Sequence, residues 1–195
     1  MGYEMHCEVR QFVCMNVWTR FLISSVMTTG VVASLSATTL QQLTFDDMIQ
    51  KSTAIVRARV TGSQSSARGA DIYTHFQLQV LETWKSSGRA TTEVAVPGGV
   101  ANGIRQIVTG VPELKPGQEY VLFLWTGRSG LTQVIGLSQG LFKVSEESSG
   151  GAVAQRPPAT EPMLDPSGSL VEDRAVRIQL QDLRARVLRV LGAAK

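Results

Sequence analysis

The sequence is poor in the residues from which disulfides, thiolate metal sites and histidine-based active sites are built. It contains two cysteines and two histidines among 195 residues, and the cysteines, Cys7 and Cys14, both lie near the N-terminus. Any domain that begins after residue 14 therefore has no thiol. This excludes a disulfide, a cysteine nucleophile and a thiolate metal site from such a domain, which must be stabilised by its hydrophobic core.

Acid–base and metal-binding side chains are also sparse. One histidine, His75, remains beyond the N-terminal segment, on the polar face of a predicted strand, where a lone histidine is usually solvated. The adjacent acidic pairs Asp46–Asp47 and Glu172–Asp173 open predicted helices, where the helix dipole accounts for them. The sequence thus predicts no catalytic residues, no metal site and no cofactor, and we expect that the protein is not an enzyme.

The sequence has an excess of positive charge at its C-terminus and no excess of either sign elsewhere. Residues 170–195 hold six basic and three acidic residues and account for the whole net charge of +3, whereas residues 1–37 and 38–169 are each neutral. A neutral main domain with a short basic tail does not indicate nucleic-acid binding. We therefore expect no nucleic-acid partner.

Residues 1–37 have the layout of a secretory signal peptide. Arg20 precedes an apolar run, Phe21 to Ser36, that ends in small residues. Cleavage is expected after Ala37, with cleavage near Ala33 as the alternative, and the protein is then secreted or periplasmic. A retained membrane anchor is less favoured, because the run is short and rich in serine and threonine for a span of about 20 residues.

Met15 is an alternative start of the chain. The segment that begins there has normal signal-peptide proportions, whereas residues 1–14 add two glutamates and an unusually long polar region before the apolar run. With this start, both cysteines fall outside the translated chain.

The main domain, residues 38–156, is predicted to consist of short β-strands. Thr53 to Val60 alternates between apolar and polar residues before a Gly/Ser/Gln loop, and Ile72 to Trp84 forms a longer alternating strand. Further strands are expected at residues 93–96, 104–108, 120–125, 131–135 and 141–144. Many short strands without interleaved helices are typical of an antiparallel barrel or sandwich.

The alternation in these strands also predicts a core, because a half-buried strand hides every second residue. The side chains expected to point into one single core are Phe76, Leu78, Val80, Val121, Phe123 and Phe142.

Two helices and a linker complete the predicted architecture. A short N-terminal helix begins at Thr44, whose side chain is placed to cap it together with Asp47. Residues 157–168 are rich in proline and predict a linker. Residues 169–195 predict an amphipathic C-terminal helix that a capping box of Ser169 and Glu172 would open.

The apolar stripe of this C-terminal helix consists of Val176, Leu180, Leu183 and Val187, and arginines occupy the remainder. We expect the stripe to cover the barrel. Membrane contact through the basic face is the alternative, and it is not favoured because the apolar stripe already has a surface to cover.

Three segments, Ser52–Gly62, Tyr73–Lys85 and Gly117–Leu124, together resemble the netrin-type module found in tissue inhibitors of metalloproteinases. The same arrangement is familiar from exported bacterial proteins of unassigned function. The resemblance covers residues 44 to 145 and implies a mainly β fold, an antiparallel OB-like barrel with flanking helices. Those inhibitors chelate the zinc of their target through an N-terminal cysteine, which the expected mature chain lacks, so no inhibitory residue can be assigned.

Loops at one end of the barrel are the expected binding surface, because OB-type barrels commonly bind through loops. They span Ser63 to Ala70, Pro97 to Gly103 and Gly127 to Gly130. The glycines of the second loop lack the lysine and the following helix of a phosphate-binding loop. The candidate binding residues are Trp84, Pro97, Gly98, Gly99, Asn102, Trp125 and Arg128. Each of the two tryptophans ends a strand and is either a core lid or a binding anchor.

The turn Gly136 to Gly140 matches the G-x-S-x-G pattern of a hydrolase, with Ser138 as the nucleophile. That motif requires a helix after the serine, whereas a strand is predicted there. The preferred hypothesis is therefore an exported, non-enzymatic binding or structural module with a protein or cell-envelope partner. A serine hydrolase that uses Ser138 is the alternative.

Export makes a direct prediction about the mature N-terminus. Mass spectrometry of protein isolated from its native host should show a first residue between Ser34 and Leu40, because the small-residue segment ends there. An intact N-terminus at Met1 or Met15 in that material would contradict export.

Overall fold

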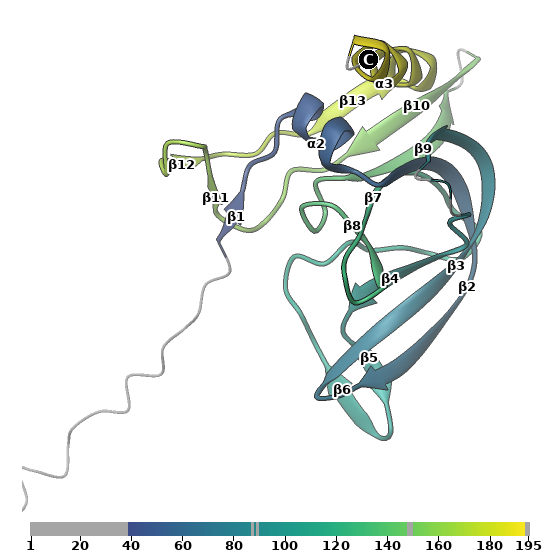
Figure 1. Cartoon of the computed structure of the whole chain (residues 1–195), viewed down its shortest axis with the longest axis vertical. Helices are drawn as coiled ribbons and strands as arrows, with labels where there is room; N and C mark the ends of the chain where they lie inside the picture. Colours follow the sequence, from purple (N-terminus) through teal and green to yellow (C-terminus); the bar gives the residue numbers. More distant parts are fainter. Residues whose placement is uncertain (1–38, 87, 89, 148–149, 194–195) are drawn as a thin grey trace, which may run out of the picture. The chain divides into compact units, whose positions relative to one another are not determined.

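The computed structural model describes residues 39–86, 88, 90–147 and 150–193 (Figure 1). The predicted signal peptide lies outside these residues. The fold is mainly β, as expected, with antiparallel sheets and two helices. The helices are α2 (Phe45–Lys51) and α3 (Leu180–Ala193). The strands are β1 (Leu40–Gln41), β2 (Ala54–Arg68), β3 (Asp71–Lys85), β4 (Glu93–Pro97), β5 (Gly99–Ala101), β6 (Ile104–Gln106), β7 (Glu119–Thr126), β8 (Thr132–Val134), β9 (Leu141–Glu147), β10 (Gly151–Arg156), β11 (Met163–Leu164), β12 (Leu170–Val171) and β13 (Val176–Gln179).

The main sheet has eight antiparallel strands. Seven follow the order β13-β10-β9-β7-β2-β3-β4, and β8 also pairs with β7. The edge strand β4 lies against β8, although no ladder of hydrogen bonds joins them among the described residues. A second sheet, β1-β11-β12, contains one parallel pair, and β5 and β6 form a separate hairpin.

Strand β7 lies in the middle of the sheet and is buried on both faces. Val121 and Phe123 belong to one core cluster, which lies under the two helices and is called here the helix-side cluster. Tyr120, Leu122 and Leu124 belong to a second cluster on the opposite face, called here the inner cluster. The unbroken apolar run in β7 follows from this position, because a strand covered on both faces exposes neither set of side chains.

The prediction of a single core is therefore wrong. Phe142 joins Val121 and Phe123 in the helix-side cluster, whereas Leu78 lies in the inner cluster with Phe76 packed against it. Val80 is exposed. Buried and exposed side chains do not alternate regularly along β3. Its pairing with β2 contains three register shifts, and each shift changes which side chains face the core.

Strands β2 and β3 form a hairpin longer than the sequence predicts. The Gly/Ser/Gln segment expected to be a loop continues β2 to Arg68, and the turn is limited to Gly69 and Ala70. Polar side chains hold this extension together: the hydroxyls of Ser65 and Thr74 lie 2.9 Å apart across the pair. Low hydrophobicity therefore marks a solvent-facing strand here rather than a loop.

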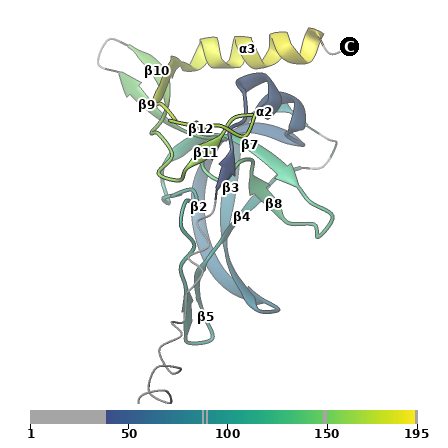
Figure 2. The same ribbon diagram turned by 90° about the vertical axis from the view of Figure 1, so that its left-hand side faces the viewer.

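Helix α2 confirms the predicted N-terminal helix. The Thr44 side chain accepts a hydrogen bond of 3.1 Å from the backbone N–H of Asp47, which is the expected cap. Phe45 packs edge-on against Phe123, with ring centroids 5.6 Å apart. Figures 1 and 2 show α2 beside α3, and the two helices together cover the helix-side cluster.

Helix α3 begins eleven residues later than predicted, at Leu180 instead of Ser169. Asp165 holds residues 165–169 in a turn, because its Oδ1 accepts from the backbone N–H of Ser169 at 2.9 Å. Val176, predicted on the apolar stripe of the helix, lies in β13 and pairs with β10. The stripe itself is correct from Leu180 onward, and no helix among the described residues is long and apolar enough to cross a membrane.

The proline-rich segment, residues 157–168, is part of the folded structure rather than a loose linker. Its strand β11 pairs with β1 and β12, and Met163 in this strand is fully buried. Arg156, which precedes the segment, binds both carboxylate oxygens of Asp173 at 2.5 and 2.9 Å. This pair joins the residue that precedes the predicted linker to a residue that follows it.

The position of α3 predicts that two of its leucines contribute differently to the stability of the protein. Leu183 is 0% exposed and Leu188 is 43% exposed. Leu183→Ala should lower the free energy of unfolding by about 2–5 kcal/mol, because it leaves a cavity under the helix. Leu188→Ala, the matched control, should lower it by less than about 1 kcal/mol. Urea denaturation of both variants measures the difference, and equal losses would contradict the lid role of α3.

The Arg156–Asp173 pair predicts a pH dependence of stability. Burial opposes ionisation of Asp173, but hydrogen bonds from Arg156 and from the backbone N–H of Ala159 outweigh it and lower the pKa of Asp173 below its ordinary value. Its contribution to stability is therefore present at neutral pH and lost as the pH falls below about 4 toward the lowered pKa.

Asp173→Asn should therefore destabilise the protein by about 3–5 kcal/mol at neutral pH, because Arg156 is left buried without its counter-ion. The difference from the wild type should shrink in acid, where the wild-type carboxylate is itself protonated. Denaturant unfolding at several pH values measures this, with the exposed Asp71→Asn as the control. A difference that stays constant with pH would contradict the ion pair.

Candidate functional site

The three predicted loops are brought together at one end of the molecule, which is called here the loop end. It comprises the turn Gly69–Ala70, the β5–β6 hairpin and the loop 127–130 between β7 and β8. Arg68 donates a hydrogen bond of 2.8 Å to the carbonyl of Ser129 and so joins the first and third of these. Gln106 accepts from the backbone N–H of Ile72 at 2.6 Å and attaches the second. Both views show β5 far from the helices (Figures 1 and 2).

The candidates Pro97, Gly98 and Gly99 shape the loop end without being free to bind. Pro97 is the last residue of β4, and Gly98 accepts a hydrogen bond of 2.8 Å from the Thr74 hydroxyl through its carbonyl. Gly99 has a φ of +134°, and a Cβ there would lie 2.4 Å from Oγ1 of Thr74. These glycines therefore allow the chain to cross closely over β3.

The segment after Gly99, expected to be a rim loop, is an ordered hairpin. Asn102 and Gly103 form its two-residue turn, and both have positive φ angles, +52° and +76°. An Asn-Gly pair favours such a turn, because both residues tolerate this backbone conformation. This dipeptide is the signal in the sequence that indicates the hairpin, although the segment was predicted to be a loop.

Two large apolar side chains of this hairpin, and a third directly after it, are exposed to solvent. Val100 is 57% exposed, Ile104 64% and Ile107 80%. The sequence predicted a short strand at residues 104–108 but did not predict that its isoleucines are exposed. Val100 pairs with Arg105 and Ile104 pairs with Ala101, so Val100 and Ile104 lie on opposite faces of the hairpin. Single exposed apolar residues are common, but several in one short segment make this segment a candidate binding surface.

A groove separates the hairpin from the β2–β3 turn. Its volume is about 440 Å³, and Ala70, Asn102, Ile104 and Arg105 are among the residues that line it. Arg105 lies opposite Val100 in the pairing of β5 with β6, so a cation accompanies the apolar side chains. The candidate Asn102 thus lines a recess in addition to forming the turn.

Two other candidates are accessible near the loop end. Trp125 is exposed on β7 and shares a small cavity of about 140 Å³ with Pro97, Pro112 and Leu137. Arg128 is exposed in the loop between β7 and β8. Both side chains can contact a partner without any rearrangement of the core.

Trp84 must be removed from the candidates. Its side chain is buried in the helix-side cluster, and its Nε1 donates a hydrogen bond of 3.0 Å to Glu82. Of the two roles predicted for Trp84, the structure assigns the core lid. The loop between β3 and β4 begins beyond it, which is why its position in the sequence suggested a binding residue.

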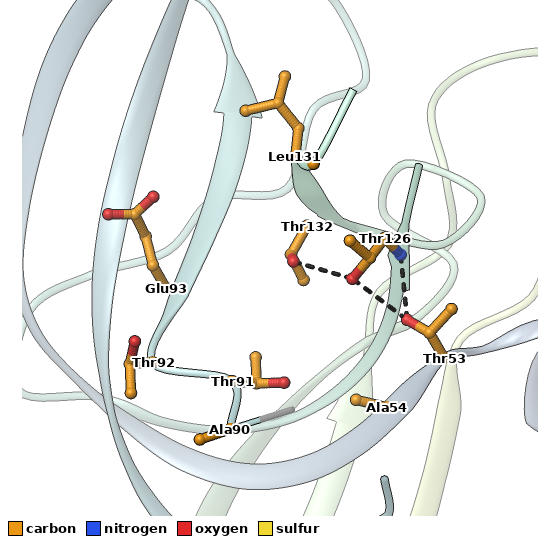
Figure 3. A pocket seen from close by; sticks show the side chains of 10 residues that line it. Thr53, Ala54, Ala90, Thr91, Thr92, Glu93, Thr126, Leu131 and Thr132 are labelled. Carbon is orange, nitrogen blue, oxygen red and sulfur yellow. Dashed lines mark hydrogen bonds between the residues drawn. The ribbon is translucent and has the colours of Figure 1, made fainter. Parts of the chain in front are cut away.

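A separate cavity of about 450 Å³ is rich in threonine (Figure 3). The hydroxyl of Thr126 lies 2.9 Å from that of Thr132, and the backbone N–H of Thr126 donates to Oγ1 of Thr53 at 3.0 Å. These hydroxyls bind one another and hold the ends of β2, β7 and β8 together. The network accounts for Thr53, Thr126 and Thr132 as structural residues.

Glu93, which also lines this cavity, pairs with His75, whose Nδ1 lies 2.7 Å from Oε1 of Glu93. The histidine is therefore not simply solvated, as the sequence suggested, but has a carboxylate partner on the neighbouring strand. In the part of the chain that the structure describes, no group of three or more histidine, cysteine, aspartate or glutamate side chains is placed to hold a metal ion.

Ser138 lies in the turn between β8 and β9, and strand β9 follows it instead of a helix. None of the side-chain hydrogen bonds among the described residues reaches its hydroxyl. The hydrolase alternative thus remains a prediction without a positioned acid or histidine partner.

Comparison with known proteins does not identify a function for the site, which is therefore interpreted from its geometry. The resemblance to the netrin-type module remains a prediction from the sequence. No protein-family model matches the chain, and no curated protein and no solved structure matches it either.

Proposed function

We propose that this protein is an exported, non-enzymatic binding module whose loop end contacts a protein or another component of the cell envelope. The fold proposed for it is an OB-like, netrin-type barrel. The approach of β4 to β8 supports this fold, because contact between these strands brings the two sides of a curled sheet together.

The observation that carries the proposal is the exposed apolar surface of the β5–β6 hairpin. Val100, Ile104 and Ile107 contribute little to either core cluster, yet each keeps a large side chain in water. Complete burial of one such side chain on a partner is worth about 1.5–3 kcal/mol. Val100 and Ile104 lie on opposite faces of the hairpin, so a partner that encloses the hairpin would bury both.

Charge around the loop end supports the same conclusion. Arg105 lies on the hairpin and Arg128 lies in the neighbouring loop, both exposed. Arginine is enriched in protein interfaces, where polar side chains surround an apolar centre. A partner that offers acidic groups beside an apolar patch fits this surface.

Helix α3 is the less favoured contact surface, because two of its three arginines are engaged within the protein. Arg184 lies 3.3 Å from a carboxylate oxygen of Glu82, and Arg186 lies 3.4 Å from Asp46. Arg186 also stacks on the ring of Phe45 at 4.4 Å. Binding of α3 to an anionic membrane would have to compete with these contacts.

The double variant Ile104→Ser/Ile107→Ser tests the loop end. Binding of the purified protein to an envelope fraction of its own host should weaken about tenfold or more, because the apolar centre of the interface is removed. Leu170→Ser is the matched control, since Leu170 is 74% exposed but lies on β12, in the second sheet. Its binding should be unchanged.

Protein-free vesicles made from the host's envelope lipids form a second arm of the test. Binding that appears with the vesicles and depends on Ile104 and Ile107 would identify the lipid surface as the partner. Equal binding of the double variant and the wild type to the envelope fraction, with both proteins folded, would overturn the proposal.

A further inference from the structure

A cavity of about 500 Å³ lies apart from the loop end, between residues 110–115 and 156–161. Its other lining residues include Tyr120, Leu141, Lys143 and Gln155, which belong to β7, β9 and β10. Lys143 pairs with Tyr120 on one side and with Gln155 on the other, so the three lie in one cross-strand row. The volume is within the range of small-ligand sites.

Glu161, one of the residues that line this cavity, is unusual among the acidic residues. It is 8% exposed, and within the described part of the chain no cationic side chain lies within ion-pair distance of it. Its one hydrogen bond comes from the Thr160 hydroxyl, 2.8 Å from Oε1. Burial of a carboxylate without a counter-charge destabilises a protein, so this group calls for a function.

The position of Glu161 depends on a close contact with the facing segment. Gly110 has a φ of +78°, and a Cβ there would lie 2.4 Å from the carboxyl carbon of Glu161. The absence of a side chain at Gly110 therefore makes room for this carboxylate. The two segments that form the cavity are thus fitted to each other around the charge.

The second carboxylate oxygen of Glu161 stays available to a ligand. Among the described side chains, Nε of Arg156 is the one polar atom that is both fully buried and without a hydrogen-bond partner. Oε2 of Glu161 has no hydrogen-bond partner either. Because it is not fully buried, this oxygen keeps contact with solvent. A group that enters the cavity can replace this solvent.

The remaining charges around the cavity select the ligand further. Lys115 is paired with Glu113 at 3.1 Å, and Arg156 is paired with Asp173. Lys143 is exposed and has no ion pair in the part of the chain that the structure describes. The cavity thus presents one unpaired anion that is buried and one unpaired cation that is exposed.

We propose that this cavity binds a small zwitterion, an amino acid or short peptide, with its ammonium group on Glu161 and its carboxylate toward Lys143. The buried carboxylate requires a cation, and burial strengthens the pairing between them. Lys143 disfavours a ligand with a second positive charge at its outer end, whereas Glu113 offsets the charge of Lys115. Leu141 and the prolines of the two facing segments provide apolar contacts for the carbon chain between the charges.

Calorimetric titration of the full chain tests this proposal with four probes: 6-aminohexanoate, glycylglycine, hexanoate and hexylamine. At least one of the zwitterions should bind at concentrations up to about 10 mM. Hexanoate and hexylamine each lack one of the two charges and should bind about tenfold more weakly or worse. The two zwitterions distinguish an ω-amino acid from a peptide as the preferred ligand.

Glu161→Gln should weaken binding of the zwitterion about tenfold or more, because it removes the charge and retains the shape. Lys143→Gln should weaken binding of the zwitterion but not of hexylamine. This second variant keeps the test valid if Glu161→Gln fails to fold, because Lys143 is exposed. Asp71→Asn is the control and should bind as the wild type does, since Asp71 is an exposed carboxylate that does not line the cavity.

Three results would overturn the proposal: no binding of either zwitterion to the folded protein, equal binding of hexanoate, or equal binding by Glu161→Gln. Equal binding of hexylamine to the wild type would refute the role of Lys143. The variant Ile104→Ser/Ile107→Ser should bind the zwitterion normally. This result separates the cavity from the loop end, so that either proposal can fail without the other.

Discussion

Both core clusters depend on strand β7, which is buried on both of its faces from Tyr120 to Leu124. Its side chains alternate between the helix-side cluster and the inner cluster, so a shift by one residue would exchange the two sets. Hydrogen bonds to β2 on one edge and to β9 on the other fix the register. Trp125 belongs to this strand and the loop 127–130 follows it directly, so the packing of β7 also positions a part of the candidate site.

Local patterns in the sequence predict those elements whose conformation local interactions decide. The strand predicted from Ile72 to Trp84 matches β3 to within one residue at each end, although the register shifts against β2 break the alternation of buried and exposed side chains. Thr44 caps α2 through Asp47, an interaction that spans three residues. The apolar stripe of α3 is also correct from Leu180 onward, since the spacing of buried residues follows the helical period.

The errors come from interactions between residues far apart in the sequence. Ser169 and Glu172 form a good capping box, but Asp173 binds Arg156, and the pairing of β13 with β10 holds Val176 extended. An ion pair and a strand ladder together outweigh a helix-capping preference worth about 1 kcal/mol. The assumption of one core failed for a related reason: alternation shows that a strand has two faces, but not that both faces are covered.

The same contrast between local interactions and interactions of distant residues applies to the functional surfaces. Glycine and proline mark turns in the sequence, but the predicted loops 63–70 and 97–103 largely form strands, and the sequence does not show that Ile104 and Ile107 stay exposed. Nor does it distinguish Glu161 from any other acid in a proline-rich segment, since the burial of Glu161 arises only when Gly110 is folded against it. An exposed apolar patch favours aggregation and an unpaired buried carboxylate favours unfolding. Neither feature serves the core that β7 organises, and each is relieved by a different kind of contact, which is the physical reason to treat them as two separate sites.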